Sequence, residues 1–550
     1  MKQQWLDKLD ESLVKPFYEH QSESQIEEGF NNTLSFGTAG IRSTFGIGPG
    51  RLNAFTVRKV ALGFANYLKN NCKRPIVVIH FDTRHLSKAF CNEMATMLAS
   101  NGIQTIISNS YKSTPELSFA VRHLQANAGI MITASHNPKN YNGIKVYNHE
   151  GGQLLPEDSE ILSTYINSID KPLDIPKGDF DQLIAEGTIE YLNDEVTNSY
   201  KQAVKNLVGK IEQDNVKVVL TSLHGTSLPL LSDILNDLDY NNYVIEQEQS
   251  IPDGDFPSVT SANPEEVEAF DKGIDLARQT DAKLVIATDP DADRFGFVEI
   301  DDNQNYHYFN GNEIGLILMK LRYQDLIVKD SDLYIIKSIV TSEMAQRLAE
   351  SLNVAVNNVL TGFKYISDLL SQKETSSEKL LLAFEESHGY LAQSISRDKD
   401  AIQMVPLIIK YKNLLAQNGL SFKEILDDIY NNIGHFKDKT IAPMFEGQEG
   451  NAKIERIMQQ FRQEDNKLAT ICGLNIRQIE DYEKGSLIDK ESETDSQLDL
   501  PKTNLIRFIF DEGFIALRPS GTEPKIKLYF SLNVENIDDI SQQFVKTFIE

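Results

Sequence analysis

The feature that most constrains the fold is an alternation of short apolar runs of strand type with segments of helical periodicity. The first helical segment is 56–71, where apolar residues recur at the spacing of one helix face. Strand-type runs and helical patterns then alternate at 76–79, about 88–101, 104–107, 116–125 and 129–132. Such alternation predicts parallel βαβ units, in which ligands bind at the carboxyl ends of the strands.

The same alternation recurs along the chain, and each later apolar run ends in polar residues. These runs are 216–220 before Ser222 and His224, 284–287 before Asp289, 333–336 before Lys337, and 380–383 before Glu385. We therefore predict an α/β protein with domains at 1–205, 206–312, 313–432 and 433–550. The last domain has a mixed α+β pattern, and its polar, acidic stretch 484–499 is predicted to be a solvated loop.

The net charge of −26 argues against nucleic acid or an anionic membrane as a partner. No apolar run approaches the ~20 residues of a membrane helix, and the N-terminal segment lacks the apolar core of a signal peptide. Three widely spaced cysteines, Cys72, Cys91 and Cys472, suggest neither a disulfide framework nor a zinc site. We expect a cytoplasmic protein, a monomer or weak dimer, in which any anionic substrate is bound by a local group of Arg and Lys.

The apolar run that ends at Ile132 leads into Thr133-Ala134-Ser135-His136-Asn137-Pro138. Asn137-Pro138 forces a turn, because proline fixes its own φ and disfavours a helical conformation in the residue before it. This arrangement is expected to expose the Ser135 hydroxyl at the mouth of a strand, with an imidazole beside it and the amine of Lys145 ten residues on. Taken alone, a Ser-His pair is far more often part of an ordinary polar turn than of a catalytic site.

Three carboxylates, Asp289, Asp291 and Asp293, alternate along the segment that follows another apolar run. The spacing does not fit an EF-hand, whose sixth position would be Arg294 instead of Gly and whose twelfth would be Ile300 instead of Glu. Acidic residues at the end of a buried strand are costly unless their charge is neutralised. The pattern favours a divalent cation, with Mg²⁺ held by few protein ligands and a phosphate oxygen, over a solvated turn.

Three further segments could bind anions or sugars. Arg518-Pro519-Ser520-Gly521-Thr522 combines a guanidinium, two hydroxyls and a glycine, which suits a phosphate, although a surface turn is the alternative. Glu385-Glu386-Ser387-His388-Gly389 could accept hydrogen bonds from sugar hydroxyls, or be a solvated strand end. Phe36-Gly37-Thr38-Ala39-Gly40-Ile41-Arg42 could approach an anion through its backbone, or be a plain turn.

Taken together, these motifs resemble those of the α-D-phosphohexomutase superfamily, and within it the phosphoglucomutases. The serine segment resembles the family's phosphoserine loop, Asp-Pro-Asp-Ala-Asp-Arg its metal loop, Glu-Glu-Ser-His-Gly its sugar loop, and Arg-Pro-Ser-Gly-Thr-Glu-Pro its phosphate loop. Gly-Thr-Ala-Gly-Ile-Arg and Pro252-Asp253-Gly254-Asp255-Phe256-Pro257 are further family-like segments. Four motifs in the family's order span the chain. They imply three related α/β domains with mixed sheets, plus a smaller C-terminal α+β domain, around a central cleft.

The resemblance implies an enzyme that interconverts α-D-glucose 1-phosphate and glucose 6-phosphate through glucose 1,6-bisphosphate. Ser135 would carry the phosphoryl group, and its phosphate would bind one Mg²⁺ together with Asp289, Asp291 and Asp293. The residues implied to bind the sugar and the phosphate that does not react are Thr361, Gly362, Glu385, Ser387, Lys399, Arg518, Ser520, Gly521 and Thr522.

The resemblance places His136 and Lys145 near the transferring oxygens and Arg42 and Arg294 around the phosphoserine. Lys145 is the candidate general base, which requires neighbouring cations to depress its pKa. Arg42, Lys145, Arg294, Lys399 and Arg518 would form the local basic group that an anionic substrate needs.

Several alternatives remain open at the level of sequence. The double glutamate before Ser387 is typical of glucose enzymes, but His388 departs from their commonest pattern. The early glycine motif and the length also resemble a subgroup with phosphopentomutases and a sugar-bisphosphate synthase, and phosphomannomutase is a further rival. A metal-dependent sugar phosphatase with an aspartyl nucleophile would leave Ser135 and Arg518 unexplained. A sugar-phosphate binder without catalysis is the remaining hypothesis.

Overall fold

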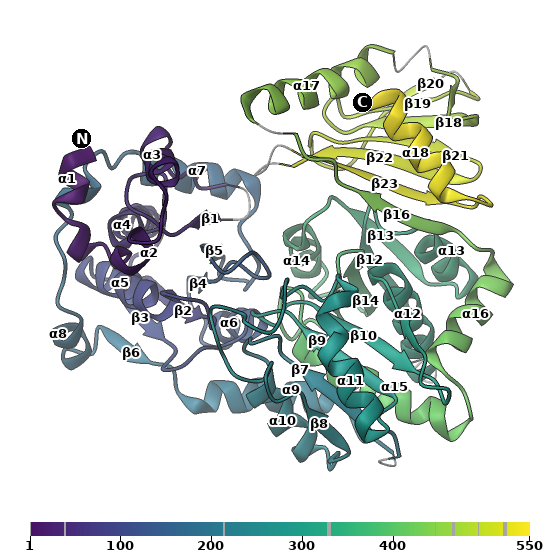
Figure 1. Ribbon diagram of the computed structural model, residues 1–550, viewed down its shortest axis with the longest axis horizontal. Helices are drawn as coiled ribbons and strands as arrows, with labels where there is room; N and C mark the ends of the chain where they lie inside the picture. Colours follow the sequence, from purple (N-terminus) through teal and green to yellow (C-terminus); the bar gives the residue numbers. More distant parts are fainter. Residues whose placement is uncertain are drawn as a thin grey trace. The chain divides into compact units, whose positions relative to one another are not determined.

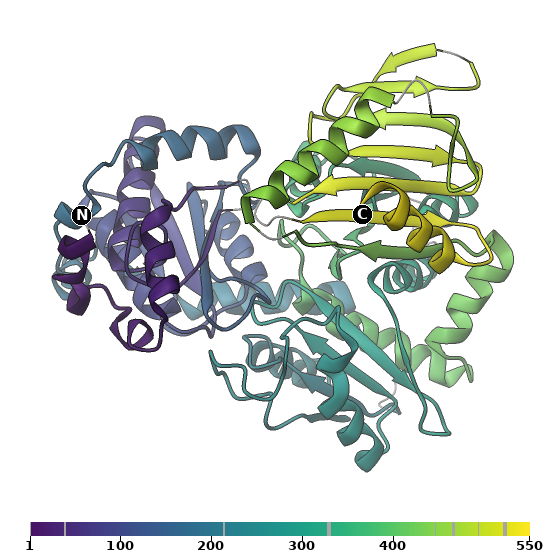
Figure 2. The same ribbon diagram turned by 45° about the horizontal axis from the view of Figure 1, so that its top comes forward.

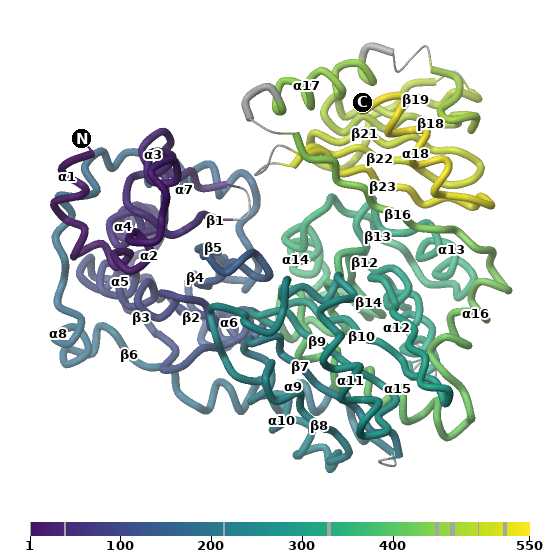
Figure 3. Tube along the Cα trace, in the orientation of Figure 1, coloured from purple at the N-terminus to yellow at the C-terminus, as the bar shows by residue number. Residues whose placement is uncertain are grey.

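The computed structural model describes residues 2–37, 40–212, 215–326, 332–445, 447–464, 468–492, 494–520 and 525–550 (Figures 1 and 3). The chain forms two compact units. The first unit comprises 1–311, 363–376 and 387–423, and the second comprises 312–362, 377–386 and 424–550. In the described part of the chain, no helix is both long enough and apolar enough to cross a membrane.

The first unit begins with short helices and a six-stranded mixed sheet. The helices are α1 (Lys2–Leu6), α2 (Lys15–Tyr18) and α3 (Glu23–Asn31). The strands, in spatial order, are β1 (Ile41–Thr44), β5 (Tyr141–Tyr147), β4 (Ala128–Ile132), β2 (Ile76–Phe81), β3 (Gln104–Ile107) and β6 (Ile189–Tyr191). β4, β2, β3 and β6 are parallel, whereas β5 runs antiparallel to both its neighbours. The predicted βαβ units are therefore confirmed.

Helices cover both faces of this sheet (Figure 1). One face packs against α4 (Ala54–Asn71), α5 (Ser87–Ser100) and α7 (Pro156–Asn167), and the other against α6 (Thr114–His123) and α9 (Asp194–Val208). α8 (Phe180–Ala185) packs against α5. Because both faces are covered, β2 and β4 consist of nearly continuous apolar residues, as buried parallel strands do. The helix predicted at 56–71 is α4, which begins at a capping box between Asn53 and Thr56.

The second sheet of the first unit carries the metal-loop motif. Its strands, in spatial order, are β11 (Tyr306–Tyr308), β10 (Phe295–Ile300), β9 (Leu284–Thr288), β7 (Val218–Thr221) and β8 (Tyr243–Ile245). α11 (Asp271–Thr280) packs on its apolar face, and α10 (Leu228–Asp237) contacts α9 and α15 (Ala401–Gln417). β9 and β10 form an antiparallel pair, so the segment 289–294 is the connection between two buried strands. α14 (Phe363–Gln372) and β15 (Gly389–Leu391) also belong to this unit.

The second unit contains a parallel sheet and a separate antiparallel sheet. The parallel strands are β13 (Ala355–Val359), β12 (Leu333–Ser338) and β14 (Lys379–Glu385). The helices of this part are α12 (Gly311–Leu326), α13 (Glu343–Ser351) and α16 (Phe422–Ile433). Gly315 allows α12 to approach β14 closely, because a Cβ there would lie 2.2 Å from the Phe384 ring.

The antiparallel sheet of the second unit runs to the C-terminus. Its strands, in spatial order, are β16 (Lys437–Ile441), β23 (Ile526–Leu532), β22 (Gly513–Pro519), β21 (Ile506–Phe510), β18 (Leu474–Asp481), β19 (Ser486–Asp489) and β20 (Thr494–Gln497), with β17 (Thr470–Ile471) beside β18. α17 (Gly447–Glu464) and α18 (Ile537–Phe548) lie side by side on one face, where Phe461 stacks on Phe544 with centroids 5.8 Å apart (Figure 2). Three α/β/α domains followed by an α+β domain confirm the predicted fold class.

The prediction of a solvated loop at 484–499 is wrong, because this stretch contains the two strands of a hairpin, β19 and β20. β19 pairs with β18, so the hairpin extends the sheet at its edge. The exposed side chains of β20 explain why the sequence resembles a loop: an edge hairpin with little apolar burial lacks the alternation by which strands are recognised. Charged residues on such an edge also discourage pairing with other chains.

Candidate active site

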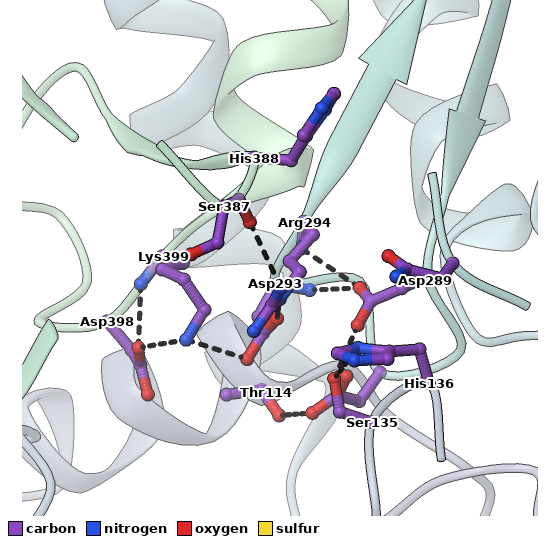
Figure 4. A network of polar contacts seen from close by, with 12 residues as sticks. Thr114, Ser135, His136, Asp289, Asp293, Arg294, Ser387, His388, Asp398 and Lys399 are labelled. Atoms are coloured by element: carbon purple, nitrogen blue, oxygen red, sulfur yellow. Dashed lines mark hydrogen bonds and ion pairs between the residues drawn. The ribbon is translucent and has the colours of Figure 1, made fainter. Parts of the chain in front are cut away.

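Ser135 lies in the loop between β4 and β5, at the carboxyl end of β4. Its backbone adopts a left-handed conformation with φ of 52°, and the Thr133 hydroxyl accepts a hydrogen bond from the Ser135 N–H at 2.9 Å. The Ser135 hydroxyl donates to Asp289 Oδ2 at 2.7 Å and lies 3.3 Å from His136 Nδ1 (Figure 4). The expectation of an exposed hydroxyl is wrong, since Ser135 is only 1% exposed. The metal loop covers it.

The predicted metal ligands Asp289, Asp291 and Asp293 converge in the connection between β9 and β10. One carboxylate oxygen from each lies within 4.8 Å of the others, and all three residues are buried. Asp289 Oδ1 accepts hydrogen bonds from the N–H groups of Asp293 and Arg294 at 3.1 and 2.9 Å. Among the described residues, Asp291 Oδ1 and Asp293 Oδ1 have no hydrogen-bond partner. Converging carboxylates with free buried oxygens fit a hard divalent cation such as Mg²⁺.

Mutual repulsion in this triad affects protonation. Burial raises the pKa of Asp289 well above its ordinary value, and the charges of Asp291 and Asp293 raise it further. Burial would also raise the pKa of Asp291, but the charge of Lys145 together with hydrogen bonds from Asp289, Lys145 and Thr114 outweighs burial and lowers the pKa. The raised pKa of Asp289 reflects the mutual repulsion of three carboxylates this close together. A divalent cation would supply the missing positive charge.

Lys145 lies in β5 and is paired with the metal loop. Its ammonium nitrogen is 2.8 Å from Asp291 Oδ2 and 3.2 Å from Asp293 Oδ2. Burial acts to lower the pKa of Lys145, but these two carboxylates outweigh it and raise the pKa overall. The prediction that neighbouring cations depress the pKa of Lys145, as a general base requires, is therefore wrong for this arrangement. The raised pKa favours the protonated ammonium, which is a buried cation and hydrogen-bond donor.

Lys399 is a second cation beside the triad. Its ammonium nitrogen lies 3.0 Å from Asp293 Oδ2 and 3.2 Å from Asp398 Oδ1 (Figure 4). Asp398 also accepts a hydrogen bond from the Tyr147 hydroxyl at 2.8 Å. The structure thus brings Lys399 to the metal loop, and its role in binding the phosphate that does not react stays a prediction.

Arg42 lies in β1 and contacts the serine loop, whereas Arg294 is the last residue of the metal loop. Gly40 has φ of 97°, and a Cβ there would lie 2.2 Å from the Ile144 carbonyl oxygen, so only glycine allows β1 to enter beside β5. Arg42, in β1, donates to Asn137 Oδ1 at 2.9 Å. Arg294 pairs with Glu265 and donates to the Ser387 carbonyl at 3.1 Å.

His136 is neutral in this environment. Burial lowers its pKa well below the ordinary value, and the positive charges of Arg294 and Arg42 lower it further. A neutral imidazole 3.3 Å from the Ser135 hydroxyl can accept a proton from it.

The remaining predicted binding residues are divided between the units. Ser387 lies in the first unit beside Arg294. The residues Thr361, Gly362, Glu385, Arg518 and Ser520 lie in the second unit. There the Gly362 N–H donates to the buried carboxylate of Glu385 at 2.6 Å, so two of the predicted binding residues are in contact. Thr38, Ala39, Gly521 and Thr522 lie outside the described residues.

Two residues of the site were missed by sequence reasoning. Thr114, at the start of α6, donates from its hydroxyl to Asp291 Oδ2 at 2.8 Å, and its N–H donates to the Asp291 carbonyl at 2.8 Å. Arg84 donates to the Ser135 carbonyl at 2.6 Å. A signal for Arg84 existed, since Asp82-Thr83-Arg84 follows β2, the parallel neighbour of β4. The contact of Thr114 with a residue 177 positions away had no local signal.

Comparisons with known proteins agree with this arrangement. Family models described as phosphoglucomutase/phosphomannomutase alpha/beta/alpha domains I, II and III match residues 33–173, 198–302 and 310–433. A phosphoglucomutase of Staphylococcus saprophyticus is 66% identical over 550 residues, covering 100% of this chain and 99% of the relative. One of Staphylococcus aureus is 47% identical over 98% of this chain and 97% of the relative.

Solved structures share the fold at low identity. A putative phosphomannomutase from Thermus thermophilus has a TM-score of 0.67 at 20% identity, covering 94% of this chain and 98% of that one. The open form of the Paramecium phosphoglucomutase pp63/parafusin has a TM-score of 0.67 at 18% identity, covering 94% of each chain.

Proposed function

Because the chain belongs to the phosphoglucomutase/phosphomannomutase family, we propose that it is a phosphoglucomutase. It interconverts α-D-glucose 1-phosphate and glucose 6-phosphate through a phosphorylated Ser135 and a glucose 1,6-bisphosphate intermediate. The observation that carries the proposal is the 2.7 Å hydrogen bond from the Ser135 hydroxyl to Asp289, which joins the nucleophile to the predicted metal loop. The naming of relatives as phosphoglucomutases supports the choice of glucose. We also propose that the four domains of the family end at residues 205, 312, 432 and 550 of this chain.

The proposed cofactor is one Mg²⁺, held by Asp289, Asp291 and Asp293 together with the phosphate on Ser135. The free buried oxygens of Asp291 and Asp293 and the raised pKa of Asp289 fit a cation in the middle of the triad. When bound, the ion supplies positive charge that polarises the phosphoryl group. Thr114 and Lys145 hold Asp291 from two sides, so this carboxylate is already oriented.

The chain's own residues supply the proton and charge chemistry. When Ser135 accepts a phosphoryl group from a sugar bisphosphate, the sugar oxygen–phosphorus bond breaks and a bond from Ser135 Oγ to phosphorus forms. The hydroxyl proton of Ser135 passes to His136 Nδ1, which lies 3.3 Å away, and the sugar oxygen that leaves phosphorus takes up one proton to become a hydroxyl group. Lys145, which stays protonated, stabilises the negative charge on the transferring oxygens.

The second half of the reaction needs the bisphosphate to turn so that its other phosphate faces Ser135. Glu385, which accepts a hydrogen bond from the Gly362 N–H, would bind the sugar hydroxyls together with Gly362 and Thr361. Arg518 and Ser520 would bind whichever phosphate is not reacting, because a guanidinium recognises a phosphate in either orientation of the sugar.

The test follows glucose 1-phosphate to glucose 6-phosphate with Mg²⁺ and a trace of glucose 1,6-bisphosphate. Wild type is expected to be active, and Ser135→Ala is expected to fall to the background of the assay. Ser159→Ala is the matched control: Ser159 is a buried serine of α7 whose hydroxyl has no hydrogen-bond partner among the described residues, so this variant should keep full activity. Turnover by Ser135→Ala would overturn the phosphoserine role. Faster turnover of mannose 1-phosphate or ribose 1-phosphate by wild type would transfer the proposal to a phosphomannomutase or phosphopentomutase.

A further inference from the structure

The side chain of Arg84 lies behind the serine loop and is fully buried. Its guanidinium donates to the Ser135 carbonyl at 2.6 Å, to the Pro138 carbonyl at 3.0 Å and to the Tyr141 carbonyl at 3.1 Å, and it also donates to the Asn137 carbonyl. Three of these carbonyls belong to the loop between β4 and β5 that carries Ser135, and the fourth belongs to Tyr141, the first residue of β5. One buried side chain therefore binds the loop and its junction with β5 at four points.

The loop needs such support because its backbone is strained at Ser135. A φ of 52° lies in the left-handed region, which residues with a Cβ adopt only when their surroundings impose it. Carbonyls turned into the protein interior also require donors, since an unpaired buried carbonyl is unfavourable. A guanidinium offers five N–H groups in one rigid plane and can serve several carbonyls together, whereas an ammonium offers three donors without a fixed plane.

The guanidinium is itself held from two further directions. Asp82 Oδ2 lies 3.6 Å from Arg84 Nε, and the ring of Phe256 covers the guanidinium with its centroid 4.9 Å from Cζ. Phe256 belongs to the family-like segment 252–257, to which the proposed function assigns no role. This segment packs closely against the loop after β2, because a Cβ at Gly254 would lie 2.6 Å from the backbone nitrogen of His85.

The serine loop also borders a cavity of about 480 Å³, which is lined by His136, Asn137 and Pro138 of the loop and by Phe256 and Pro257 of the segment 252–257. Asp289 and Arg42 make hydrogen bonds with side chains of the loop. Arg84 instead binds four backbone carbonyls of residues 135–141, so it acts on the path of the backbone itself.

We propose that Arg84 is a positioning residue for phosphoryl transfer, which fixes the Ser135 hydroxyl against the metal loop by binding the carbonyls of the serine loop. Phe256 keeps the guanidinium in the plane that those carbonyls require. The proposal rests on the proposed function, because it presumes that Ser135 is the residue that is phosphorylated. Arg84 acts through Ser135 and is not assigned any contact with the substrate.

The first variant is Arg84→Lys, with Arg58→Lys as the matched control. Arg58 is also buried in the first unit, pairs with Glu93 at 2.6 Å, and lies 5.5 Å from the Phe55 ring centroid. It therefore shares the burial, the carboxylate and the aromatic contact of Arg84. The difference is that, among the described contacts, Arg58 has none with the serine loop.

The readout is the rate at which Ser135 is phosphorylated by glucose 1,6-bisphosphate in a single turnover, followed by intact-mass spectrometry, together with kcat and KM. We expect Arg84→Lys to slow phosphorylation and kcat by about 100-fold, as displacement of a reacting group by about 1 Å does, with KM for glucose 1-phosphate changed less than about threefold. Arg58→Lys should lower the melting temperature as much, yet phosphorylate at the wild-type rate.

Each outcome is decisive. Arg84→Lys at the wild-type rate overturns the proposal, and so does an equal slowing in Arg58→Lys, because the effect would then be a general loss of packing. If Arg84→Lys fails to fold, Phe256→Leu decides: slower phosphorylation at unchanged KM supports the proposal, and a normal rate overturns it. Wild type that is never phosphorylated on Ser135 refutes the proposed function instead, so the two failures are distinguishable.

Discussion

Each unit of the molecule buries a lysine in a central sheet, and the two lysines respond to burial in opposite ways. Lys145 in the first unit touches Asp291 and Asp293, and these carboxylates raise its pKa although burial acts to lower it. Lys337 in the second unit donates to the Thr341 carbonyl at 3.2 Å. Burial, together with the charge of Arg507, lowers its pKa to about 8. Burial is similar in both, so the difference comes from the carboxylates in contact.

The comparison distinguishes a buried ammonium that is paired with carboxylates of the proposed site from a buried ammonium that has no close carboxylate partner. Lys145 is part of a compensated cluster, in which a cation, three carboxylates and a proposed Mg²⁺ balance one another. Lys337 lies near the carboxylates of Glu343, Asp438 and Glu386, but their combined effect is weaker than burial. The first lysine should therefore matter for activity, and the second for the pH dependence of stability.

The sharpest test compares Lys145→Met with Lys337→Met, two changes of nearly equal size. Lys145→Met should reduce kcat by about 100-fold, since a buried donor to the transferring oxygens is lost. It should also lower the free energy of unfolding by about 3–5 kcal/mol, because Asp291 and Asp293 lose their partner. Lys337→Met should leave kcat within about twofold and the free energy of unfolding at pH 7 unchanged or higher, because a buried ammonium without a close carboxylate is removed. Equal losses in both variants, by steady-state kinetics and urea unfolding, would contradict the comparison.

A smaller effect is expected on the pH dependence of stability. The pKa of Lys337 is about 8 in the folded chain and near 10.4 in the unfolded chain. Between these two pH values the unfolded state binds more protons, so the free energy of unfolding rises with pH by about 3 kcal/mol.

Asp438 has the opposite effect. Burial raises its pKa to about 7, although hydrogen bonds from Ser531 and Ser342 act to lower it. The folded state then binds more protons between about pH 4 and 7, so stability falls as pH rises there.

Because Asp438 lowers the free energy of unfolding as pH rises to about 7 and Lys337 raises it above about 8, their combined contribution is smallest between about pH 7 and 8. Urea unfolding followed at a series of pH values should show the fall and the later rise. Asp438→Asn should remove the fall below pH 7, and Lys337→Met should remove the rise above pH 8. Slopes that persist in the variants would show that other groups cause them.

The smallest effect is expected for His388, the residue that departs from the commonest glucose pattern. Its ring lies away from Ser387 and is placed between the Phe295 carbonyl and the Tyr308 hydroxyl, each 3.2 Å from a ring nitrogen (Figure 4). Burial lowers its pKa to about 4, so the neutral ring stabilises the fold increasingly as pH rises from about 4 to 6.5. His388→Phe should cost about 1 kcal/mol of stability and change the preference for glucose 1-phosphate over mannose 1-phosphate by less than about threefold. A larger change in preference would show that His388 takes part in sugar binding.

The positions of the strands and of the chemical groups at their ends were predictable from local pattern. β3 has the predicted limits, and β2, β4, β9, β12 and β14 begin within two residues of the expected positions, because buried parallel strands need continuous apolar runs. The hairpin of β19 and β20 was not predictable. β20 is polar and exposed along its whole length, β19 has only two apolar residues, and the position of the hairpin is determined by pairing of β19 with β18.

The sequence by itself determined the residue types of the site: a serine after β4, three alternating carboxylates after β9, and arginines in or next to strands, all in the order of one family. Only the tertiary structure decided which groups meet. Lys145 contacts Asp291, which is 146 positions away, and Arg84 contacts Ser135, which is 51 positions away. In this packing the pKa of Lys145 is raised where the sequence predicted a lowered one, and the Ser135 hydroxyl is buried where the sequence predicted an exposed one. The physical reason is that charge interactions and burial depend on distances in space, which the packing of sheets and loops creates and local sequence does not contain.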